Sequence, residues 1–120
     1  MHCNFYLRKG TVYVPTTGKM DKGFYRGVEP VAVVHASHIE EVRQALQSTI
    51  ARGNPIVPML PRREWPPPVL LKYAGVKSWS GFERDMLLWS ISQRDGVFQI
   101  ASKAKQSDGM WKDDPEQFPV

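Results

Sequence analysis

The sequence predicts a single α+β domain over residues 1–120, with one principal amphipathic helix packed on a mostly antiparallel sheet of about five to six strands. Three observations lead to this prediction. Aromatic and β-branched segments flank two short turns, at Lys9 with Gly10 and at Asp95 with Gly96, and this is the pattern of β-hairpins. Apolar residues recur most clearly with helical spacing in one stretch, residues 38–52. A chain of 120 residues can bury one core of this kind.

The first hairpin is predicted from residues 5–8 and 11–14. A two-residue turn between them fixes which side chains lie opposite each other. The expected pairs are Leu7 with Val12, Phe5 with Val14, and Tyr6 with Tyr13. Because the tyrosine pair lies on the other face from the aliphatic pairs, this part of the sheet is expected to have an aromatic outer face.

The principal helix is predicted to follow a central strand. A continuous apolar run at residues 31–34 is typical of a strand buried inside a sheet. Ser37 and Glu40 have the spacing of a capping box, in which each side chain satisfies a free backbone donor at a helix start. Gly53 is placed to end the helix. The apolar face that should lie on the sheet consists of Ile39, Val42, Leu46 and Ile50.

Residues 55–68 hold six of the ten prolines and are predicted to form a surface loop, because proline removes the backbone donor that a helix or central strand needs. Two interpretations of this loop remain open. It is either a plain connector or a stiff recognition arm that presents Arg62, Arg63 and Trp65.

The second half of the chain predicts a short helical turn and a second hairpin. Ser80 with Glu83 has capping-box spacing. The alternation of residues 87–91 favours a strand over a continued helix. Closure at Asp95 and Gly96 would oppose Ile91 with Ile100 and Gln93 with Phe98. Residues 104–120 are expected to form a loosely structured tail or an edge strand.

The net charge of +4 and the pI of about 9.4 allow a nucleic acid or another anionic partner without requiring one. Basic residues gather in the first 27 positions, whereas acidic residues gather in the tail. The single cysteine, Cys3, excludes an internal disulfide, and the N-terminal residues lack the pattern of a signal peptide. These observations predict a cytoplasmic protein that does not enter the membrane.

Candidate chemistry is sparse. His35 and His38 lie where the predicted strand meets the helix, where backbone donors could receive an anion. They lack a nearby carboxylate and a third ligand, so a structural or solvated role is favoured over a metal site. Cys3 has no activating motif and is interpreted as an ordinary thiol at the edge or in the core of the sheet. No phosphate loop, nucleophile elbow or zinc spacing is found, so the sequence predicts neither a cofactor nor an enzyme.

The four tryptophans leave two kinds of partner open. Exposed indoles beside cations can stack on bases and bind phosphates, but they also form the hot spots of protein interfaces. A nucleic-acid-binding module or small ribonuclease is therefore the alternative function. That alternative would use Lys72, Lys77, Arg84 and His35.

Several segments together carry a resemblance to a known family. They are Gly23-Phe24-Tyr25, Glu29-Pro30-Val31, Arg52-Gly53-Asn54-Pro55, residues 71–79, and Trp89-Ser90-Ile91. Over residues 23–91 the chain resembles the immunity proteins of contact-dependent growth inhibition systems, which are encoded beside polymorphic toxins. The resemblance implies a non-enzymatic cytoplasmic protein that binds the toxin domain delivered by a sister cell and covers its active site.

The contacts with such a toxin are predicted at exposed aromatic and acidic residues. Inhibitors of nucleases are often acidic because they compete with a polyanion, whereas this chain is basic. The resemblance is then consistent with a contact through acidic residues, Glu40 and Glu41 among them, or with a toxin that is not a nuclease. The predicted contact residues are Asp108, Asp113, Asp114, Glu116, Trp65 and Trp111.

Overall fold

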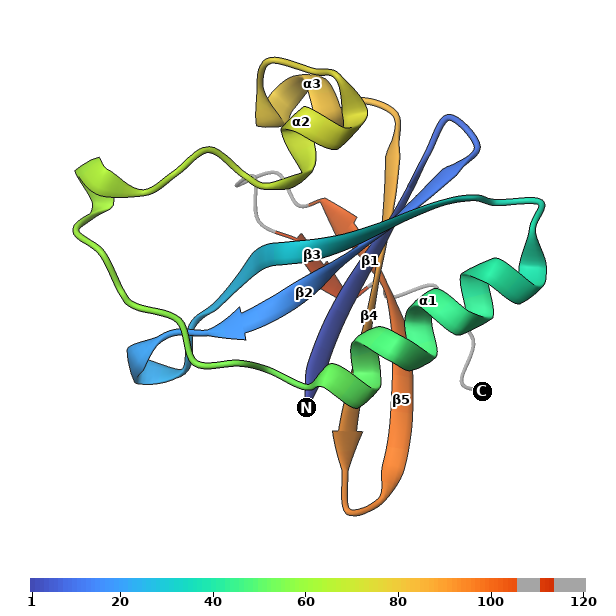
Figure 1. Cartoon of the computed structure of the whole chain (residues 1–120), viewed down its shortest axis with the longest axis horizontal. Helices are drawn as coiled ribbons and strands as arrows, with labels where there is room; N and C mark the ends of the chain where they lie inside the picture. The colour runs from blue at the N-terminus through green and yellow to red at the C-terminus, as the bar shows by residue number, and fades with distance from the viewer. Residues whose placement is uncertain (106–110, 114–120) are drawn as a thin grey trace.

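A six-stranded antiparallel sheet forms the centre of the structure, a computed structural model that describes residues 1–105 and 111–113 (Figure 1). The strands lie in the order β3-β2-β1-β4-β5-β6. Their bounds are β1 His2–Arg8, β2 Thr11–Lys19, β3 Tyr25–His35, β4 Met86–Arg94, β5 Val97–Lys105 and β6 Trp111–Asp113. The predicted α+β class and the number of strands are confirmed.

Helices cover both faces of this sheet. Helix α1 (Ile39–Arg52) packs over β1, β2 and β3 on one face. Two short helices, α2 (Leu70–Ala74) and α3 (Trp79–Glu83), cover the opposite face. Single 3-10 turns occur at Asp21–Gly23 and Arg62–Glu64. Within the described residues, no helix has the length and apolar character of a membrane-spanning segment.

Both predicted hairpins are present, because their turn residues adopt the required backbone geometry. The φ angles are 50° at Lys9, 77° at Gly10, 54° at Asp95 and 77° at Gly96. Two successive positive φ angles match the twist of the flanking strands. The observed partners include Leu7 with Val12, Tyr6 with Tyr13, Ile91 with Ile100, and Gln93 with Phe98, as predicted.

The predicted pairing of Phe5 with Val14 is wrong. The ladder between β1 and β2 covers Tyr6–Arg8 and Thr11–Tyr13 and extends no further. Pro15 has no N–H with which to continue it. Beyond the ladder, the side chain of Asn54 joins the two strands by hydrogen bonds to His2 and Thr17.

The run at residues 31–34 does not form a central strand, because β3 lies at the edge of the sheet. The interior position is taken by β1, which pairs with β2 on one side and with β4 on the other. The apolar run is explained instead by packing on both faces. Val31 packs against the cluster under α2 and α3, and Val34 packs against the cluster under α1, while Val33 stays exposed.

The predicted helix is confirmed, but its capping box is not. The helix begins at Ile39 with His38 at the N-cap position, and no side chain caps it. The Ser37 hydroxyl is engaged by the His35 imidazole, with 2.7 Å between Oγ and Nδ1. Ile39 is exposed, so Val42, Leu46 and Ile50 form the packed face together with Ala45. Gly53 ends the helix with a φ of 75°, and its N–H is donated to the Ile50 and Thr49 carbonyls.

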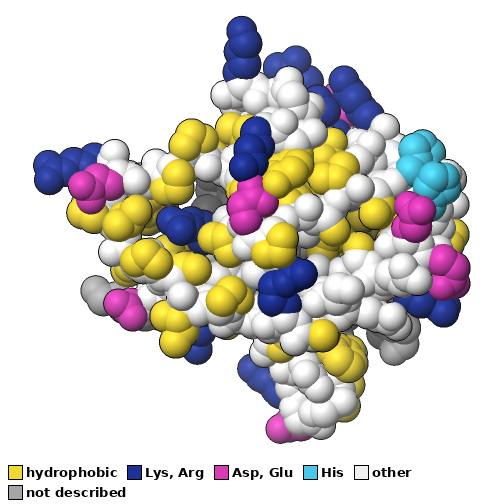
Figure 2. Space-filling model, viewed as in Figure 1, with side chains coloured by type: hydrophobic (Ala, Val, Ile, Leu, Met, Phe, Trp, Pro, Cys, Tyr) yellow, Lys and Arg dark blue, Asp and Glu magenta, His cyan; other side chains and the backbone are white. Residues whose placement is uncertain are grey.

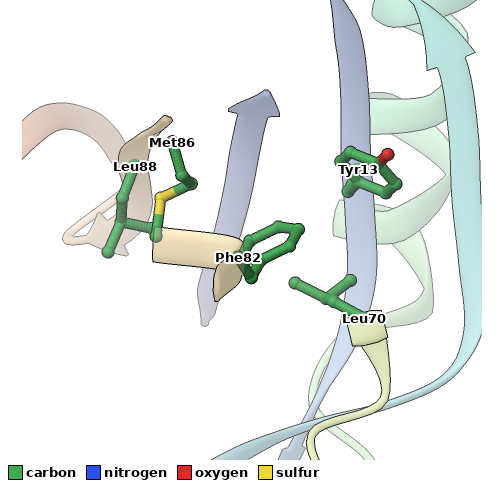
Figure 3. Close-up of a cluster of buried hydrophobic side chains, with 5 residues drawn as sticks. All are labelled: Tyr13, Leu70, Phe82, Met86 and Leu88. Atoms are coloured by element: carbon green, nitrogen blue, oxygen red, sulfur yellow. The ribbon is translucent and has the colours of Figure 1, made fainter. Parts of the chain in front are cut away.

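The aromatic face formed by Tyr6 and Tyr13 is covered, not outer as predicted. Tyr13 is 5% exposed and contacts Phe82, which projects from α3 into this cluster (Figure 3). Ser78, and not Ser80, caps α3, because the Ser78 hydroxyl accepts from the Gly81 N–H at 3.2 Å. The sequence placed a helical turn here but did not show which face of the sheet it would cover.

Candidate functional site

A groove of about 800 Å³ lies between the proline-rich segment (residues 55–68), the edge strand β3 and helix α2. Its walls are mostly apolar. Figure 2 shows hydrophobic side chains along the arc formed by this segment, with a hollow between the arc and the rest of the molecule. The principal apolar side chains of the lining are Tyr6, Trp65, Pro67, Val69, Leu71 and Trp79.

The proline-rich segment is fixed at both ends, as an ordered wall requires. At its start, Lys19 of β2 donates its N–H to the Pro55 carbonyl and accepts from the Val57 N–H, at 2.8 and 3.0 Å. Gly18 permits this approach, since a Cβ there would lie 2.8 Å from Cγ1 of Val57. At its end the chain enters α2, whose Leu70 is buried in the core. Between these ends, residues 55–68 hold one 3-10 turn, Arg62–Glu64, and one isolated bridge, Lys19 with Ile56.

Trp65 is the predicted contact residue that lies in the groove. Its side chain is exposed, and its indole N–H donates to the Leu60 carbonyl at 2.7 Å. Trp111 and Asp113 begin and end β6, which pairs with β5 at the edge of the sheet. The other predicted contacts, Asp108, Asp114 and Glu116, lie outside the described residues.

Cationic side chains outnumber acidic ones in the groove. Glu29 is fully engaged, with its carboxylate 2.5 Å from both the Lys72 ammonium and the Tyr73 hydroxyl. The hydrogen bond from Lys72, and then that from Tyr73, lowers the pKa of the Glu29 carboxyl, and the same contacts raise the pKa of Lys72 and of Tyr73. Arg26 and Lys77 also line the groove.

Arg26 is the residue that the sequence analysis missed. Its Nε and Nη1 atoms are buried and have no hydrogen-bond partner in the described part of the chain. A weak signal was present, because Arg26 and Val28 are the half-buried positions of an alternating stretch of β3. That alternation does not reveal whether a buried guanidinium is paired, since pairing depends on segments far away in the sequence.

His35 and His38 do lie together, but at the surface and away from the groove lining. Their ring centroids are 5.3 Å apart. The expectation that they lack a nearby carboxylate is wrong for His38, because its Nδ1 lies 3.3 Å from a carboxylate oxygen of Glu41, one helical turn away. Among residues 1–105 and 111–113, no cluster of three or more potential metal ligands is found. Of the residues proposed for nucleic acid, Lys72 and Lys77 line the groove, whereas His35 and Arg84 do not.

A second exposed feature lies on the face of the sheet that α1 only partly covers. We define the apolar strip as Leu87, Phe98 and Ile100, which are 56%, 52% and 56% exposed. The alternation of β4 and the pairing of Ile91 with Ile100 place all three on the α1 side, beside the stacked rings of Phe5 and Trp89. Figure 1 shows the β4–β5 hairpin extending beyond the rest of the sheet.

Cys3 is buried, and burial raises the pKa of its thiol from 9.0 to about 11. A thiol is neutral below its pKa, so this shift removes thiolate at ordinary pH. We expect the native protein at pH 8 to react with iodoacetamide about 100-fold more slowly than a thiol of ordinary pKa. Mass spectrometry of labelled protein over time measures the rate, with the urea-unfolded chain as the control. Equal rates in the native and unfolded states would contradict the burial of Cys3.

A comparison with known proteins finds no matching family model, no matching curated protein and no matching solved structure. The fold and the two exposed features are therefore the basis for any functional proposal.

Proposed function

We propose that this protein is a non-enzymatic binding protein, and specifically an immunity protein that binds and neutralises a cognate bacterial toxin domain in the cytoplasm. The observation that supports a protein partner is the apolar strip. Phe98 and Ile100 expose large apolar side chains two residues apart on one face of β5, and Leu87 exposes another on the same face of the paired strand β4, beyond Trp89. Contiguous exposed apolar side chains are characteristic of surfaces that bind other proteins.

The strip is held in a form suited to recognition. The ladder of β4 and β5 runs from Leu88 with Lys103 to Arg94 with Val97, so the backbone under the strip is fixed before binding. Ile91, opposite Ile100, is buried in the cluster under α1. A surface ordered in advance loses little conformational entropy when a partner binds.

The acidic residues of the tail would contribute electrostatic attraction to the toxin contact. Strand β6 places the backbone of Trp111 and Asp113 next to β5, the strand that carries Phe98 and Ile100. We propose that the acidic charge of the tail speeds association with a basic toxin surface. Trp65 lines the groove and would contact the toxin only through a second surface.

The test is binding to the product of the neighbouring gene. We expect the two purified proteins to form a complex, and the double variant Phe98→Ser with Ile100→Ser to bind it at least about 30-fold more weakly, because buried apolar anchors dominate interface energies. Isothermal titration calorimetry measures the affinity, and survival of cells that express the toxin measures neutralisation.

The matched control is Ile56→Ser, since Ile56 is 85% exposed and lies outside the strip. This variant should bind like the wild type. A wild-type protein that does not bind the neighbouring gene product, or a double variant that binds it normally, contradicts the proposal. RNA or DNA binding that weakens steeply with salt would instead support the nucleic-acid alternative.

A further inference from the structure

The groove is lined by a guanidinium group, that of Arg26, which is not fully hydrogen-bonded within the part of the chain that the structure describes. Arg26 carries two buried guanidinium nitrogens without a hydrogen-bond partner in the described chain. The carboxylate in the groove, Glu29, is already bonded to Lys72 and Tyr73. A buried charged group without partners is costly, so a site of this kind favours a ligand that brings the missing acceptor.

The rest of the groove suits an apolar body. Its lining includes the indoles of Trp65 and Trp79, the ring of Tyr6 and consecutive prolines at 66–68. A volume of about 800 Å³ lies within the range of small-molecule sites, which combine apolar walls with a few polar groups that fix orientation. The ordered ends of the proline-rich segment keep these walls in place.

We propose that the groove binds a small amphiphilic carboxylate, whose carboxylate group accepts hydrogen bonds from Arg26 and whose apolar body lies against Trp65, Trp79 and the prolines. The planar guanidinium matches a carboxylate with two parallel hydrogen bonds. This site is independent of the proposed toxin contact, because Leu87, Phe98 and Ile100 do not line the groove.

The probes are decanoate and 4-phenylbutyrate, with decanol as the uncharged match of decanoate. Isothermal titration calorimetry with the full chain should show binding of both carboxylates and at least about tenfold weaker binding of decanol, because the alcohol lacks the charged acceptor. The Trp65 and Trp79 indole N–H signals in NMR spectra should shift as decanoate is added.

The decisive variant is Arg26→Gln, with Arg94→Gln as its matched control, since Arg94 lies at the exposed end of β4. Arg26→Gln should weaken decanoate binding about tenfold or more, while Arg94→Gln should leave it unchanged. Because Arg26→Gln removes a half-buried charge whose Nε and Nη1 have no hydrogen-bond partner in the described chain, we expect it to fold and to melt at or above the wild-type temperature.

Three outcomes would each overturn the proposal. They are equal affinity for decanoate and decanol, equal effects of the two arginine variants, and no binding of either carboxylate at millimolar concentration. The comparison of decanoate with decanol uses the wild-type protein, so it stands even if a variant fails to fold. None of these outcomes affects the binding test with the neighbouring gene product.

Discussion

Replacing Phe82 with alanine is expected to lower the free energy of unfolding by about 3–5 kcal/mol, the range for deleting a fully buried aromatic side chain. Phe82 is 0% exposed and contacts three rings, of which Figure 3 shows that of Tyr13. Its centroid lies 5.8 Å from Tyr6, 5.7 Å from Tyr13 and 5.2 Å from Trp79. The alanine variant loses these contacts and leaves a cavity between α3 and the sheet.

The Phe82 ring also makes a cation–π contact with the Arg8 guanidinium. The Arg8 guanidinium lies 5.9 Å from the Phe82 centroid, and Arg8 Nε is buried without a hydrogen-bond partner among the described residues. The attraction between the cation and the ring partly compensates for that missing bond. The alanine substitution removes this interaction as well, which places the expected loss above that of a purely aliphatic contact.

Urea unfolding followed by circular dichroism measures the effect. Phe24→Ala is the matched control, because Phe24 is exposed, and it should change stability by less than about 1 kcal/mol. A loss below about 1.5 kcal/mol for Phe82→Ala would mean that α3 does not pack on the sheet as described.

The elements that the sequence predicts are those determined by neighbouring residues. The two hairpins follow from turns whose residues accept positive φ, and α1 follows from apolar spacing within 14 residues. The capping box failed because a local competitor, the His35 imidazole, engages the Ser37 hydroxyl. The sequence pattern alone does not show whether the Ser37 hydroxyl bonds the helix start or the imidazole two residues before it.

The missed features depend on distant segments. The edge position of β3 follows from the pairing of β1 with β4, which brings together residues 78 to 90 positions apart. The burial of Tyr13 depends on Phe82 in the same way. Arg26 was missed because its importance lies in two guanidinium nitrogens without a hydrogen-bond partner among the described residues, and that property depends on how β3 and the proline-rich segment lie together in the fold.

Replacing Asn54 with alanine is expected to lower the free energy of unfolding by about 2–4 kcal/mol, because three partly buried backbone groups lose their hydrogen-bond partner. Asn54 donates to the carbonyls of His2 at 2.7 Å and Thr17 at 2.8 Å, and it accepts from the His2 N–H at 2.9 Å. These bonds join β1 to β2 beyond the end of their ladder. They also attach the end of α1 to the sheet, since Asn54 directly follows the Gly53 cap.

Two measurements test this role of Asn54. Urea unfolding gives the loss of stability, with Gln47→Ala as the control, because Gln47 lies exposed on α1 and should change stability by less than about 0.5 kcal/mol. Hydrogen exchange should show faster exchange of the His2 amide in Asn54→Ala, because that amide loses its acceptor. Asn54→Asp should also be destabilising, since it places a carboxylate oxygen against two carbonyl oxygens. Wild-type stability in Asn54→Ala would mean that the two strands are held together without this side chain.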